Sequence, residues 1–65
     1  MLSAAELTSC RDLLVSARTA AIWVATVFHG DGNVGAAARL RSIAANLDAE
    51  IADIDRLLLS APPKP

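Results

Sequence analysis

The residues Gly30-Asp31-Gly32-Asn33 separate two long segments of helical pattern, and this short connection decides the predicted fold. Glycine and asparagine adopt positive φ angles at low cost, so the four residues are typical of a tight turn. A connection this short places the flanking helices side by side in opposite directions. The sequence therefore predicts one all-α domain over residues 1–65, an antiparallel two-helix hairpin that turns at residues 30–33.

The segment before the turn, residues 3–29, carries signals for both ends of a helix. Ser3-Ala4-Ala5-Glu6 is a capping box, in which the Ser3 hydroxyl and the Glu6 carboxylate each accept a hydrogen bond from a backbone N–H without a helical partner. Gly30 directly after His29 is typical of a helix C-terminus. The spacing of apolar residues predicts an inward stripe of Leu7, Cys10, Leu14, Ala17, Ala21, Val24 and Phe28.

The segment after the turn, residues 34–60, resumes the helical spacing. Pro62 and Pro63 end this helix, because the residue before a proline avoids the α region. Residues 61–65 are expected to form a frayed, proline-rich tail. The predicted inward stripe of this second helix consists of Val34, Ala37, Leu40, Ala44, Leu47, Ile51, Ile54 and Leu58.

Charged residues of the second helix are spaced for contact with the first. Arg41, Asp48 and Asp55 fall seven residues apart on the face opposite the predicted stripe. In a hairpin that turns near residue 31, Arg11 comes level with the turns that carry Asp48 and Asp55. We therefore expect part of this charged face to form ion pairs with the first helix.

The composition restricts the class of protein and its partners. The chain has 65 residues, 54% of them hydrophobic, and a formal net charge of −1. Neither half has the basic stripe that binding to a phosphate backbone requires, so nucleic acid is disfavoured as a partner. The longest run without Asp, Glu, Lys or Arg, residues 19–30, is too short to span a bilayer. With a single cysteine and no signal-peptide pattern, the expected location is the cytoplasm, without membrane contact.

The turn matches two ligand-binding patterns, and neither fits its surroundings. Residues 30–35 read G-x-G-x-x-G, which binds dinucleotides when it follows a strand. Here a helix precedes the glycines, and Asp31 would repel a phosphate. Read as a calcium loop, the same segment has Gly35 and Ser42 where carboxylate or other oxygen ligands are needed. We expect no cofactor and no cation at this turn.

Other reactive side chains are too far apart for chemistry. Cys10 and His29 are separated by about 28 Å along one helix, at ~1.5 Å per residue, which excludes a nucleophile–base pair and a shared metal. The acids of the second helix point outward: Asp48, Glu50, Asp53 and Asp55. The sequence therefore predicts no catalytic residue, no cofactor site and no metal site, and a protein that is not an enzyme.

Apolar residues also occur on the far side of the first helix. Val15, Ile22 and Trp23 point away from the predicted stripe, so this helix is apolar nearly all round. One partner helix cannot cover both sides, and a chain this short is marginally stable alone. We expect a partner interface formed by Val15, Ile22, Trp23, Val27 and Phe28, used in a homodimeric four-helix bundle or in docking on a heterologous helical protein.

The expected function is that of a non-enzymatic protein–protein interaction module, a self-associating, coiled-coil-like hairpin acting as a small adaptor or regulatory subunit. Its length, hairpin form and central turn resemble those of the Rop family of plasmid copy-number proteins, dimers of helical hairpins that bind paired RNA loops. That resemblance implies a nucleic-acid-binding regulator as the alternative, for which Arg11 and Arg18 are the available phosphate contacts. The hairpin is also similar in size to the helical co-chaperones of type III needle subunits, which implies a secretion role.

Overall fold

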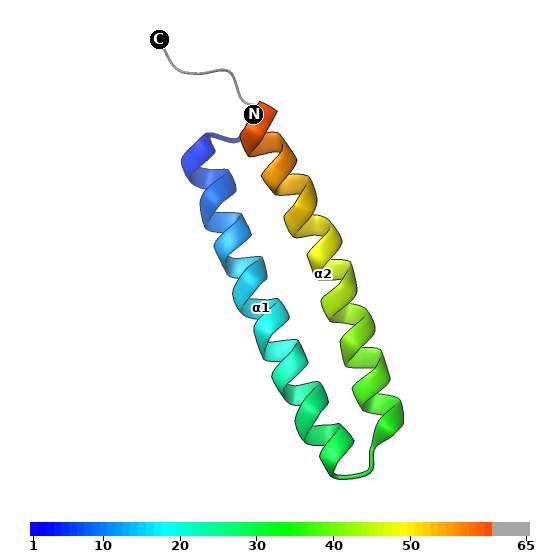
Figure 1. The fold of residues 1–65 in the computed structure, drawn as a ribbon. Coiled ribbons are helices and arrows are strands. Elements are labelled where there is room, and N and C mark those ends of the chain that lie inside the picture. The colour runs from blue at the N-terminus through cyan, green and yellow to red at the C-terminus, as the bar shows by residue number, and fades with distance from the viewer. Residues whose placement is uncertain (61–65) are drawn as a thin grey trace.

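The computed structural model describes residues 1–60 as two long helices joined by a tight turn (Figure 1). Helix α1 spans Ala4–Gly30 and helix α2 spans Val34–Ser60, each with 27 residues. The helices run antiparallel and side by side, so the start of α1 and the end of α2 lie at the same end of the hairpin. The predicted all-α hairpin is confirmed. The expected tail, residues 61–65, lies outside the described residues.

The capping box that starts α1 is formed as predicted. The Ser3 hydroxyl accepts a hydrogen bond from the Glu6 N–H at 3.0 Å, and the Glu6 carboxylate accepts one from the Ser3 N–H at 3.0 Å. Both bonds satisfy backbone donors that the first helical turn leaves without partners. The start of the helix is thus determined by four consecutive residues.

Hydrogen bonds at the turn end one helix and begin the next. The N–H of Asp31 donates to the carbonyl of Val27 at 3.1 Å and closes α1. Gly32 has a φ of 87°, which a residue with a side chain rarely adopts. Asn33 then caps α2, because its side-chain oxygen accepts a hydrogen bond from the N–H of Ala36 at 3.2 Å.

The seam between the helices is narrow. Four of residues 1–60 are buried: Leu7, Ala25, Ala37 and Ala44. Among the described residues no large side chain is fully buried. The rest of the seam is lined by half-buried side chains, including Arg11, Leu14, Arg18 and Ala21 of α1 and Leu40, Leu47, Ile51, Ile54 and Leu58 of α2. The hairpin therefore has a contact strip rather than a core.

The predicted inward stripe of α2 is confirmed except at its first member. Val34 is exposed, because it is the first residue of the helix and lies beside the turn. Asp55 is half-buried at the edge of the seam, so its predicted place on the outer face is wrong. Its carboxylate lies close to α1 because Arg11 binds it there.

The predicted inward stripe of α1 is wrong at several positions. Cys10 and Ala17 are exposed, and Phe28 is 38% exposed. Arg11 and Arg18 are half-buried in their place. The apolar pattern missed these arginines, because an arginine can lay its aliphatic stem along a seam while its charged head reaches the edge.

Candidate interaction surfaces

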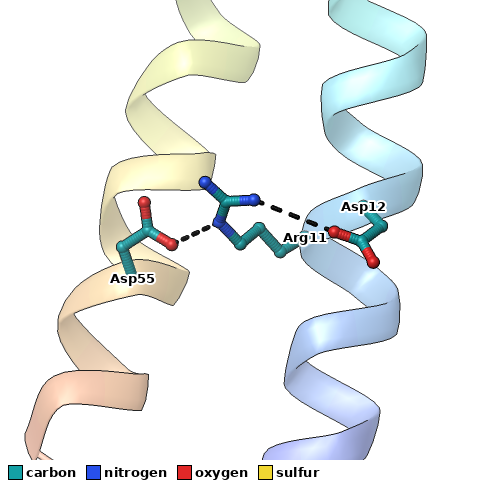
Figure 2. A network of polar contacts seen from close by, with 3 residues as sticks. All are labelled: Arg11, Asp12 and Asp55. Carbon is teal, nitrogen blue, oxygen red and sulfur yellow. Dashed lines mark hydrogen bonds and ion pairs between the residues drawn. The ribbon is translucent and has the colours of Figure 1, made fainter.

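One broad side of the hairpin carries two cross-helix ion pairs, and we call it the ionic face. The Nε of Arg11 donates a hydrogen bond to the Oδ1 of Asp55 at 2.5 Å, and its Nη1 lies 3.8 Å from the Oδ1 of Asp12 (Figure 2). The Nε of Arg18 lies 2.5 Å from the Oδ1 of Asp48, although its N–H is not aligned for a hydrogen bond. The expected pairing of Arg11 with the acids of α2 is confirmed.

The two pairs select the same alignment of the helices. Arg11 and Arg18 are seven residues apart on α1, and Asp48 and Asp55 are seven residues apart on α2. Each arginine therefore meets its aspartate at the same register, one heptad further along. Both arginines have their charge compensated within the chain, so neither presents a free positive charge of the kind that phosphate contacts use.

The five residues expected to form the partner interface do not share one side of α1. Successive helical residues are rotated by about 100°. Val15 and Ile22 therefore lie toward the ionic face, Trp23 and Val27 on the outer side of the helix, and Phe28 on the opposite flank. Trp23 is 67% exposed and borders a shallow open depression that Val15 also lines.

The opposite broad side of the hairpin, which we call the apolar face, gathers exposed apolar side chains from both helices. It lies across the seam from the arginine–aspartate pairs, since residues rotated the other way around α1 and α2 converge there. Its exposed members are Cys10, Leu13, Ala17 and Ala20 of α1 and Ile43 and Leu57 of α2, and the half-buried Val24, Leu47 and Ile54 connect them to the seam. The most exposed large one is Leu13, at 71%.

The apolar spacing of α1 does not predict the apolar face, because it places Cys10 and Ala17 on the inward stripe. A second signal was available in the sequence. Leu40, Ile43, Leu47, Ile54 and Leu57 follow alternating spacings of three and four, interrupted only at Glu50. Such spacing predicts a coiled-coil-like stripe beside the one that faces α1.

Three charged residues accompany the apolar face on α2. Glu50 lies within the stripe, and within residues 1–60 it takes part in no ion pair or side-chain hydrogen bond. Arg39 lies at the edge of the face near the turn. Asp53 lies at the same edge toward the chain ends, where it forms an ion pair with Arg56. The face thus carries Arg39 near the turn and, toward the chain ends, Glu50 and an Asp53 that also pairs with Arg56.

Helix α1 is long and apolar enough to cross a membrane by length and composition. This differs from the expectation drawn from the short charge-free run at residues 19–30. Only 11% of the apolar window is buried in the hairpin, so its surface is open to another molecule. The arginines of α1 are paired with α2, a helix that carries seven charged side chains.

The described residues bring no reactive groups together. Cys10 and His29 are both exposed and lie near opposite ends of α1. No group of three or more His, Cys, Asp or Glu within residues 1–60 could hold a metal ion. Within residues 1–60, a ligand would therefore contact an exposed surface of the hairpin, either the ionic face or the apolar face.

Comparison of the chain with protein-family models, with curated protein sequences and with solved structures finds no match.

Proposed function

We propose that this chain is a non-enzymatic protein–protein interaction module, a helical hairpin that self-associates into a four-helix bundle and acts as a small adaptor or regulatory subunit. The observation that carries the proposal is the mismatch between what the hairpin buries and what it exposes. Three of its four buried residues are alanines, while large side chains such as Leu13 and Trp23 stay in water. Association is the usual way for so small a chain to bury such surface.

A protein partner is favoured over nucleic acid. The net charge is −1, and the arginines available for phosphate contacts are already paired with aspartates of the same chain. Binding a phosphate backbone would require breaking those pairs and bringing a net negative surface to a polyanion. A second copy or another helical protein needs neither.

Sedimentation equilibrium and circular dichroism over a dilution series test the proposal. A self-associating hairpin shows twice the chain mass of 6.8 kDa at high concentration, and loses mass and helicity together on dilution. A chain that stays monomeric and fully helical at micromolar concentration would contradict self-association. In that case the interaction module would need a heterologous partner.

A further inference from the structure

We infer that the apolar face is the self-association surface, and that its occupant is a second copy of this chain lying with its turn against the chain ends of the first. The inference rests on the proposed function and adds to it the face and the orientation. In this arrangement Trp23, on the outer side of α1, stays in water. Val15 and Ile22 likewise remain outside the interface, in contrast to the interface expected from sequence.

The choice between the two broad faces follows from desolvation. Docking through the ionic face would remove water from the Arg11–Asp55 and Arg18–Asp48 pairs, whose charges are only half-buried in the hairpin. Taking such pairs out of water is costly, and their mutual attraction does not reliably compensate. The apolar face has one charged residue, Glu50, within its stripe. Its burial mostly removes hydrocarbon from water, which is favourable.

The size of the apolar face fits a second hairpin. Each helix has 27 residues and is therefore about 40 Å long at ~1.5 Å per residue. Two helices packed about 10 Å apart make a face about 20 Å wide. A broad side of the hairpin thus measures about 800 Å², comparable to what each partner contributes to a specific, stable interface of standard size. A copy of the same length covers this face from end to end.

The charges at the edge of the apolar face select the orientation. The midpoint of α2 is Leu47, with Arg39 eight residues before it and Asp53 six residues after it. Consider a twofold axis that is perpendicular to α2 and passes near its midpoint, so that the second copy of α2 runs in the opposite direction. Arg39 of one copy then lies within two residues of Asp53 of the other, a separation of about 3 Å along the helix axis. Symmetry then supplies the same pair twice, at opposite ends of the interface.

The same orientation gives Glu50 a polar neighbour in the other copy. Three residues past the midpoint, it comes level with Ala44 of the other copy, two residues from Asn46, whose amide can donate a hydrogen bond to a carboxylate. Packing with both turns at the same end would instead gather the acidic ends of the two faces together. Like charges side by side disfavour that arrangement.

Matched substitutions on the two sides of α1 test the face. Leu13 and Trp23 are 71% and 67% exposed in the hairpin, so replacing either one removes little intrachain contact. We expect Leu13→Glu to raise the dimer dissociation constant by about a hundredfold or more, because it buries unpaired charge in each copy. Trp23→Glu should leave the constant within a few-fold of wild type. Sedimentation equilibrium measures both.

The outcomes separate this inference from the proposed function. Loss of the dimer in Leu13→Glu alone supports the apolar face. Loss in Trp23→Glu alone overturns the face while self-association stands. A wild-type chain that is monomeric at every concentration overturns both. If that monomer also co-sediments with phosphatidylcholine vesicles, the apolar surface of α1 binds lipid rather than a second copy.

Charge reversals test the orientation. Arg39→Asp and Asp53→Arg should each weaken the dimer by about tenfold, and the double variant should recover most of that loss, because the pair is restored with its signs exchanged. Misfolding cannot produce such recovery. Arg41→Asp is the matched control, since Arg41 lies two residues away on the ionic-face side of α2. Additive weakening without recovery would overturn the reversed orientation.

Discussion

The Nε of Arg18 lies 2.5 Å from the Oδ1 of Asp48, one heptad along the hairpin from the bond between Arg11 and Asp55. Together the two pairs turn the arginines of α1 toward α2. Cys10 and Ala17, which the apolar spacing placed inside the seam, are exposed on the other broad side. The apolar face is therefore a consequence of where the arginines find their partners.

The Arg18–Asp48 pair should add little to the stability of the hairpin. Both side chains are substantially exposed, and such pairs contribute at most about 1 kcal/mol. We expect a double-mutant cycle of Arg18→Ala and Asp48→Ala, followed by urea denaturation, to give a coupling energy below about 1 kcal/mol. A coupling well above about 2 kcal/mol would mean that the pair is buried in the assembled protein.

Stability at the turn should depend on Gly32 more than on Gly30. Gly32 has a φ of 87°, so a Cβ there is strained even though nothing lies within 4 Å of it. We expect Gly32→Ala to destabilise the hairpin by about 1 kcal/mol. Gly30 has equal space without the positive φ, so Gly30→Ala is the matched control and should be neutral or stabilising by up to about 1 kcal/mol. Thermal unfolding of both variants decides, and equal effects would contradict this account.

The capping box should make the start of α1 sensitive to acid. The hydrogen bond from the Ser3 N–H, and then the Ser3 side chain, hold the pKa of the Glu6 carboxyl below its ordinary value of 4.5. Because the folded-state pKa is lowered, the stabilisation is present above 4.5 and is lost as the pH falls through the lowered value.

A carboxyl titration of Glu6 by NMR measures this effect. The pKa of Glu6 should lie below that of an exposed glutamate in wild type, and it should rise toward the ordinary value in Ser3→Ala, which removes the side-chain half of the box. A Glu6 pKa that does not change in Ser3→Ala would show that the Ser3 side chain does not contribute to the lowering, which would then come from the Ser3 backbone N–H alone.

The reactivity of Cys10 should depend on protein concentration. Cys10 is exposed in the hairpin and lies on the apolar face, so a chain diluted to the monomer should react with a thiol reagent about as fast as the denatured protein. Docking of a second copy on that face should slow the reaction as the concentration rises. A rate that does not vary across the association range would place Cys10 outside the interface.

The sequence by itself determined the two helices and their connection. The capping box of Ser3 and Glu6, the positive φ at Gly32 and the side-chain cap at Asn33 are local interactions between residues at most four apart, and local sequence specifies them directly. The inward stripe of α2 was also predictable. That helix has charged residues over much of its surface, which limits its apolar spacing to two neighbouring stripes, and the predicted one faces α1.

Only the tertiary structure decided which side of α1 meets α2. This helix has apolar residues nearly all round, so its spacing is compatible with several rotations of similar apolar content. The choice among them comes from contacts across the seam. Arg11 and Arg18 pair with aspartates of α2 that are thirty or more positions away, and Ala25 is buried against α2. An apolar pattern counts arginine as outward, whereas here its stem lines the seam and its charge is satisfied across it.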